Sequence, residues 1–285
     1  EGFPTSYYSA RARNALGLDS EVYPTVPKWS PAVEQEGDPS SPYLTKGDIL
    51  AALGLYRLAE REYKRAERAL SGDRFALNHL LQRYERVGAM NLALGISSRI
   101  LNLEQEEGVP MTLVSFRRLY PTYYWGEISH AAQQLDVDPN LILAIIRQES
   151  AFNEMALSRA GARGLMQVMP LTGRMLARQA HVRNFSVDDL WNPRTSIHFG
   201  AQHLSDHLRY FDKTEDRRLG LALSAYNAGL NAARRWSKRL PDDDVDTFVE
   251  SIPYRETRNY VKLVYRNYQV YSYLEGVGPD QEAVQ

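Results

Sequence analysis

Apolar positions recur at helical spacing along nearly the whole chain, whereas the alternation typical of strands is nearly absent. This pattern predicts an all-α protein. A first helix is predicted over residues 1–20, and five prolines between Pro24 and Pro42 then predict an irregular connector. A second helix is predicted by a single apolar stripe that ends at Ser71–Gly72–Asp73 and contains Ile49, Leu53, Tyr56, Tyr63, Ala66 and Leu70.

Two further helices follow, one ending at Gly88 and the next running through Leu101. Their short connections predict antiparallel neighbours. The Leu-Gly-Leu-Tyr segment at 53–56 misses the tetratricopeptide spacing by one residue, so an irregular helical array is favoured over a solenoid. A polar segment at 104–109 precedes a new apolar helix near Phe116. We therefore expect a helical domain over 1–108 and a second domain over 109–285.

The second domain begins its most regular helix at Asp138–Pro139, where Asp is suited to the N-cap and Pro to the first turn. The following run, Leu141–Ile146, is apolar on nearly every face and therefore predicts a buried helix. Later helices are predicted over 172–179, 197–210, 219–226 and 260–273.

Composition narrows the possible functions. Of 285 residues, 44% are hydrophobic and 24% charged, as in globular proteins. The 34 basic and 35 acidic side chains leave no excess to neutralise phosphates, which argues against nucleic acid as the main partner. The longest aliphatic run is too short for a transmembrane helix. The absence of cysteine excludes thiol catalysis and thiolate metal sites. Because residue 1 is Glu rather than Met, we expect a processed or trimmed chain.

Glu149 is the most informative residue, because it follows the buried run at the last turn of its helix. Burial disfavours the charged carboxylate, and the negative end of the helix dipole has the same effect. Both should raise the pKa of Glu149 toward neutrality, which suits a general acid. The alternative is a carboxylate that caps an amide of the following loop.

Three later segments also carry polar side chains in non-periodic contexts. They cover residues 158–170, with two glycines, residues 225–229, and residues 250–260. Taken singly, each segment fits a turn or a helix cap equally well.

Four ordered motifs nevertheless resemble those of the family 1 soluble lytic transglycosylases: Glu149–Ser150, Gly164-Leu165-Met166-Gln167, Ala225-Tyr226-Asn227 and Glu256-Thr257-Arg258-Asn259-Tyr260. The similarity covers about residues 112–275. The opening segment at 4–8 is similar to the end of the helical superhelix that precedes the catalytic domain in this family. The resemblance implies a lysozyme-like α-helical catalytic domain and a chain that is a C-terminal portion of a longer protein.

The resemblance also implies a reaction, which is cleavage of the bond between N-acetylmuramic acid and N-acetylglucosamine in peptidoglycan. Glu149 would be the single acid and base. Among the other matching residues, Ser158 and Gln167 would line the muramyl subsite and Met169 would border it. Tyr226 and Asn227 would sit at the cleft, with Glu256 and Tyr260 across from the catalytic helix.

Most glycosidases use two carboxylates, but none besides Glu256 stands in the matched motifs. A transglycosylase needs only one, because the C6 hydroxyl of the muramyl residue replaces water as the nucleophile. This chemistry requires no metal and no other cofactor. Two alternatives stay open, a goose-type lysozyme-like hydrolase and a non-catalytic scaffold that binds glycan or protein.

Other candidate sites are weaker. Two acidic runs, at 136–138 and 242–246, lack the glycine and glutamate of a calcium loop, so solvated loop acids are the better interpretation. His203 and His207 lack the glutamate of a zinc-protease motif and are interpreted as part of a polar helix face.

The substrate implies an export destination. Peptidoglycan strands would be the main partner, and the resemblance places the protein in the periplasm of a Gram-negative cell. The helical domain over 1–108 could recruit other cell-wall enzymes.

Overall fold

The computed structural model describes residues 6–8, 11, 39, 41–70, 72–211, 213–240 and 244–276. Within these ranges the regular structure is helical apart from two isolated β-bridges, which confirms the all-α fold class. The helix expected over 1–20 and the connector over 24–42 lie mostly outside the described residues. None of the described helices combines the length and apolarity that crossing a membrane requires.

The chain divides into two compact units. The larger unit comprises Glu1–Leu18 and Tyr124–Gly276, and the smaller unit comprises Asp19–Tyr123 and Val277–Gln285. The transition after Tyr123 falls later than the boundary expected at residue 108. The reason is that Glu104 binds the segment beyond 108, accepting hydrogen bonds from Ser115 at 3.2 Å and Arg118 at 3.1 Å.

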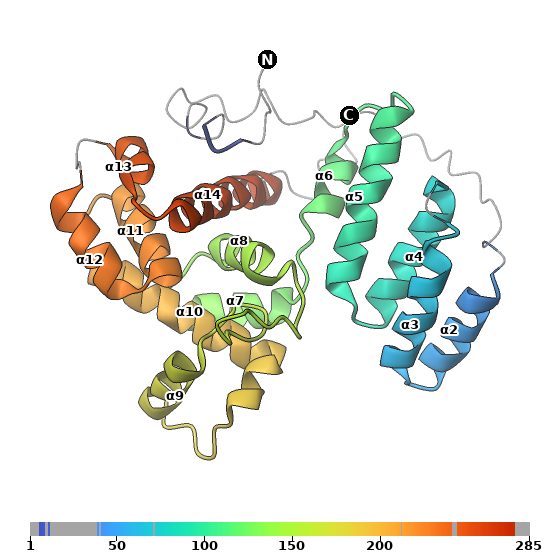
Figure 1. The fold of residues 1–285 in the computed structure, drawn as a ribbon, viewed down its shortest axis with the longest axis horizontal. Helices are drawn as coiled ribbons and strands as arrows, with labels where there is room; N and C mark the ends of the chain where they lie inside the picture. Colours follow the sequence, from blue (N-terminus) through green and yellow to red (C-terminus); the bar gives the residue numbers. More distant parts are fainter. Residues whose placement is uncertain are drawn as a thin grey trace. The chain divides into compact units, whose positions relative to one another are not determined.

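Five helices build the described part of the smaller unit (Figure 1): α2 (Pro42–Ala52), α3 (Tyr56–Glu67), α4 (Arg74–Arg86), α5 (Met90–Glu106) and α6 (Leu113–Leu119). Tyr63 and Tyr84 are fully buried in its core and meet edge to face at 6.1 Å. The Tyr63 hydroxyl donates to Asp48 at 2.9 Å, and Arg83 donates to the same carboxylate. The core therefore combines aromatic packing with a paired charge.

The single helix predicted from Ile49 to Leu70 is wrong, because α2 ends and α3 begins within it. Gly54 adopts a φ of +74°, a left-handed conformation that ends a helix. The Leu55 amide then donates back to the Leu50 carbonyl at 2.9 Å. Ile49 and Leu53 are consequently exposed instead of forming part of one buried stripe.

The larger unit contains the remaining helices: α7 (Trp125–Leu135), α8 (Pro139–Ser150), α9 (Pro170–Gln179), the 3-10 turn η1 (Val187–Trp191), α10 (Pro193–Tyr210), α11 (Glu215–Ala228), α12 (Leu230–Arg239), α13 (Val245–Ser251) and α14 (Arg255–Gly276). Helix α8 packs against α14 and α7, and α11 packs against α10, α12 and α14 (Figure 1). The segment from 151 to 169 connects α8 to α9 with little regular structure.

Helix α8 begins as predicted. The Asp138 side chain accepts a hydrogen bond from the Asn140 amide at 2.8 Å, and Pro139 occupies the first turn. Asp138 also accepts from the Tyr268 hydroxyl of α14 at 2.6 Å, so this exposed loop acid is both solvated and a helix cap. All six residues from Leu141 to Ile146 are buried. This central position fixes where the end of α8 lies.

Candidate active site

Glu149 occupies the last turn of α8, and the backbone turns sharply after it. Ala151 and Phe152 have φ values of +48° and +64°, which are costly for residues other than glycine. Phe152 is 1% exposed, so packing compensates for this conformation. Strained backbone of this kind is common at functional sites, and here it follows directly after the candidate acid.

The pKa of Glu149 is raised from its ordinary value to about 7. Burial, the cause expected from the sequence, contributes most. A hydrogen-bonding interaction with Tyr260 opposes the shift, whereas the negative charge of Glu256 adds to it. Near neutral pH the carboxyl group is therefore populated in both protonation states, as a residue that acts first as acid and then as base requires.

Tyr260 and Tyr226 lie close to Glu149. Burial and the Glu149 charge raise the pKa of both phenols, so both stay protonated at neutral pH. The Tyr260 hydroxyl is buried and lacks a hydrogen-bond partner of ordinary geometry among the described residues, although it is near enough to favour the Glu149 carboxylate. It is therefore a donor available to a ligand or to the acid itself.

Tyr226 ties α11 to the loop that follows α8. Its hydroxyl donates to the Met166 carbonyl at 2.8 Å. The Met166 amide in turn donates to the Ser196 hydroxyl of α10 at 3.2 Å, and the Met166 side chain is fully buried. The loop backbone is thereby held from both sides.

Gly164 and Gln167 shape the same loop. Gly164 has a φ of +78°, and a Cβ atom there would lie 2.1 Å from the Leu190 carbonyl oxygen. Gln167 has a φ of +49°, and its side-chain amide donates to the Ala156 and Gly164 carbonyls at 2.8 and 2.9 Å. The motif at 164–167 thus fixes the backbone conformation of the loop. The side-chain oxygen of Gln167 can still accept a hydrogen bond from a ligand.

Ser158 and Met169 lie at the two ends of this loop. The Ser158 hydroxyl accepts the Ala162 amide at 3.0 Å and keeps its own hydrogen for another partner. Met169, directly before α9, has 40% of its surface exposed. Ser158 is partly exposed as well, so solvent reaches both side chains.

Asn227 connects α11 to the start of α14. Its side-chain oxygen accepts a hydrogen bond from the Thr257 hydroxyl at 2.7 Å. Thr257 is buried, whereas its neighbour Glu256 is exposed. Asn227 therefore orients the first turn of α14, from which Glu256 acts on the pKa of Glu149.

The structure thus brings three of the predicted residues into electrostatic interaction with Glu149: Glu256, Tyr226 and Tyr260. The loop that carries Ser158, Gln167 and Met169 contacts this group at Met166, whose carbonyl accepts from Tyr226. Sequence reasoning missed Ser196 and Thr257, since a hydroxyl inside a helix gives no signal of the distant group it binds.

The interpretation of His203 and His207 as part of a polar helix face is wrong. His207 is 5% exposed, and its Nε2 atom lies 3.2 Å from Nε2 of His203. Burial lowers the pKa of His207 to about 3, which keeps that ring neutral. The His203 ring lies 5.5 Å from the Tyr226 ring, so the pair packs behind one of the candidate site phenols.

Comparison with known proteins gives a family match to part of the chain. Residues 127–248 match the family described as "Transglycosylase SLT domain". We refer to this matched segment as the SLT domain. It contains Glu149, the loop through Gln167 and the Tyr226–Asn227 pair, while Glu256 and Tyr260 follow beyond the matched residues. The resemblance expected from the four motifs is confirmed.

The SLT domain also has named relatives. A putative soluble lytic murein transglycosylase of Haemophilus influenzae is 39% identical over 145 residues, which is 50% of this chain and 24% of that protein. A soluble lytic murein transglycosylase of Escherichia coli is 36% identical over 162 residues, or 56% of this chain and 24% of that protein. The chain thus spans about a quarter of the length of these relatives.

Solved structures confirm the fold. An inactive variant of the lytic transglycosylase Slt from Pseudomonas aeruginosa superposes with a TM-score of 0.71 at 26% identity, covering 94% of this chain and 41% of that one. The 70 kDa soluble lytic transglycosylase of Escherichia coli superposes with a TM-score of 0.72 at 24% identity, covering 95% of this chain and 41% of that one. The SLT domain therefore has the lysozyme-like all-α fold expected from the motifs.

Proposed function

We propose that this chain is a lytic transglycosylase that cleaves the bond between N-acetylmuramic acid and N-acetylglucosamine in peptidoglycan, leaving 1,6-anhydro-N-acetylmuramic acid ends. The observation that carries the proposal is the carboxyl group of Glu149, placed at a strained helix end with a pKa of about 7. The SLT domain match and the names of the relatives support the same activity.

In the first step, the protonated Glu149 donates its proton to the bridging glycosidic oxygen. The bond from C1 of the muramyl residue to that oxygen breaks, and its electron pair leaves with the N-acetylglucosamine hydroxyl. The acetamide carbonyl of the muramyl residue supports the positive charge at C1. Burial of Glu149 favours this step because it keeps the acid protonated near neutral pH.

In the second step, the Glu149 carboxylate removes the proton from the C6 hydroxyl of the same muramyl residue. The oxygen attacks C1 and closes the anhydro ring, so Glu149 regains its proton and no water is consumed. Attack within one sugar can lower the barrier by roughly 7–11 kcal/mol relative to an unpositioned nucleophile. A second carboxylate to hold or activate water is therefore not needed.

The remaining site residues are assigned binding roles. The Tyr260 hydroxyl can donate to the acetamide or to Glu149, and Tyr226 can stabilise charge beside it. The Ser158 hydroxyl and the Gln167 amide oxygen can bind sugar groups, with Met169 at the border of that subsite. Asn227 orients the turn that carries Glu256, whose charge raises the pKa of Glu149.

Digestion of purified sacculi by the wild-type chain and by Glu149→Gln tests the proposal. Masses of the released muropeptides should show anhydro ends, one water lighter than reducing ends. The variant should lose at least about a hundredfold in rate, since it cannot transfer a proton. Reducing ends would instead identify the goose-type lysozyme-like hydrolase, and undiminished cleavage by the variant would leave Glu149 without a catalytic role.

The periplasm is the proposed location, because the matched relatives are named for acting on murein. Other relatives are described as membrane-bound lytic murein transglycosylases, so attachment to a membrane also occurs among similar proteins. We further propose that the helical array of the smaller unit contacts other cell-wall enzymes. Co-purification of partners with the whole chain, compared with a chain carrying charge reversals on α3, tests that role.

A further inference from the structure

We propose that the basic face of helix α12 binds carboxylates of the peptide stems carried by muramic acid. This inference rests on the proposed function and names a second contact between the protein and the same substrate. The basic face is defined by five residues that line one surface hollow of about 350 Å³: Asn231, Arg234, Arg235, Lys238 and Arg239.

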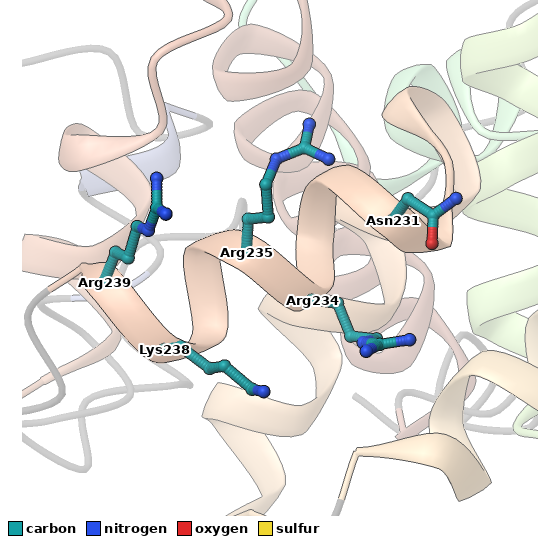
Figure 2. A pocket seen from close by; sticks show the side chains of 5 residues that line it. All are labelled: Asn231, Arg234, Arg235, Lys238 and Arg239. Atoms are coloured by element: carbon teal, nitrogen blue, oxygen red, sulfur yellow. The ribbon is translucent and has the colours of Figure 1, made fainter.

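These residues share one side of α12, because their spacing follows the helical repeat. Figure 2 shows two rows within this side, one formed by Arg235 and Arg239 and the other by Arg234 and Lys238. The opposite face is apolar and buried, and consists of Ala232, Ala233 and Trp236. Helix α12 is thus firmly seated while two rows of cations border the hollow.

The four cations of the basic face form no salt bridge with any carboxylate of the described residues. Helix α12 contains no acidic residue, and all four cationic side chains are exposed. Among the described residues no salt bridge involves them, whereas exposed cations such as Lys64 and Arg65 on α3 are paired with glutamates. In a chain with a formal net charge of −1, helix α12 itself therefore carries an excess of positive charge.

The basic face begins beside the candidate active site. Helix α12 starts at Leu230, directly after the turn at Gly229 and three residues after Asn227. Farther along, the Trp236 ring meets the Tyr254 ring edge to face at 5.1 Å, and Tyr254 lies two residues before Glu256. The Gly229 turn and the contact between Trp236 and Tyr254 therefore connect α12 to segments that carry site residues.

Peptide stems fit this face in chemistry and position. Each stem is attached to the muramyl residue whose bond is cleaved, and it carries free carboxylates. Arginine binds carboxylates in a planar, two-point geometry, and a hollow of about 350 Å³ is within the range of small-ligand sites. A membrane-surface helix would instead expose large apolar residues, but Trp236 is 6% exposed and packed inward.

Binding of the whole chain carrying Glu149→Gln to two kinds of purified glycan strand tests the inference. One kind retains its peptide stems, and the other has lost them by amidase digestion. Adding Arg235→Gln and Arg239→Gln should raise the Kd for stem-bearing strands about fivefold at low salt. The Kd for stem-free strands should change less than about 1.5-fold, and moderate salt should reduce the difference.

Matched variants separate this role from a general charge effect. Arg57→Gln with Arg61→Gln removes two exposed arginines at the same four-residue spacing on α3 and should leave both Kd values unchanged. Arg235→Lys with Arg239→Lys should restore part of the affinity. The inference would be overturned if the arginine variants lost the same affinity for both kinds of strand, or lost none. It would also be overturned if, in a parallel assay with phosphatidylglycerol vesicles, only the affinity for vesicles fell. Absence of cleavage by the wild-type chain would overturn the proposed function alone, because binding is measured separately.

Discussion

A carboxyl group that donates a proton and then recovers one works best with a pKa near the working pH. With the pKa of Glu149 at about 7, kcat/KM should fall as the pH rises above 7 and the acid ionises. Glu256→Gln removes a negative charge that raises this pKa, so the alkaline limb should move to lower pH. Initial rates on sacculi between pH 4.5 and 9 measure both profiles, and identical limbs would contradict the assigned effect of Glu256.

The raised pKa of Glu149 also affects stability. The folded chain holds the proton more tightly than the unfolded chain, so the contribution of Glu149 to stability is present below about pH 4.5 and is lost as the pH rises to 7. Glu149→Gln removes this loss. On going from pH 4 to pH 8, the unfolding free energy of the variant should rise by about 1–3 kcal/mol relative to that of wild type. Denaturant unfolding at the two pH values measures the gain.

At the residue scale, sequence reasoning succeeded where one local cause dominates. Burial at the end of an apolar helix predicted the raised pKa of Glu149. It could not anticipate that Tyr260 opposes the shift, because that interaction depends on how α14 packs against α8. The buried pair His203 and His207 was missed for a similar reason, since only tertiary packing removes one face of α10 from water.

At the scale of elements, the loop between α8 and α9 depends on Gly164. Gly164→Ala combines a φ of +78° with a Cβ atom 2.1 Å from the Leu190 carbonyl oxygen, and should cost about 4 kcal/mol or more. Gly161→Ala is a matched control. That residue has a φ of +89° with no atom within 4 Å of the added Cβ, so only backbone strain of about 1–2 kcal/mol applies. Thermal unfolding distinguishes the two variants, and equal losses would refute the steric argument.

A helix could be predicted from the sequence where it has both a clear apolar pattern and a recognisable cap. Helix α8 has both, and its start at Asp138–Pro139 is confirmed. The break at Gly54 was missed because the apolar spacing continues across it. Helix α12 is strongly amphipathic, with Ala232, Ala233 and Trp236 on its buried face, yet it was not among the predicted helices. The element that presents the basic face was thus missed.

At the scale of the whole molecule, Arg11 connects two parts of the larger unit that lie far apart in the sequence. It donates to Asp216 at 2.6 Å, to Asp246 at 3.0 Å and to the Tyr265 hydroxyl at 2.9 Å. The Tyr7 hydroxyl donates to Asp246 at 2.8 Å. These contacts connect residues more than 200 positions apart and could not be predicted from local pattern.

Arg11→Ala should therefore destabilise the larger unit. Both carboxylates are partly exposed, so we expect a loss of about 1–3 kcal/mol rather than the cost of breaking a fully buried pair. Tryptophan fluorescence during thermal unfolding reports on this unit through Trp125, Trp191 and Trp236. Lys64→Ala, which breaks the exposed pair with Glu60 in the smaller unit, should cost about 0.5 kcal/mol at most. A change of that small size in Arg11→Ala would refute its bridging role.

The same contacts have a consequence for biosynthesis. Asp246, the shared acceptor of Tyr7 and Arg11, is translated 235 residues after Arg11, which takes roughly 10–50 s at ordinary ribosome speeds. The larger unit is thus a discontinuous domain with the smaller unit inserted in its chain. During that interval Tyr7 and Arg11 lack the Asp246 carboxylate to which both donate in the folded protein.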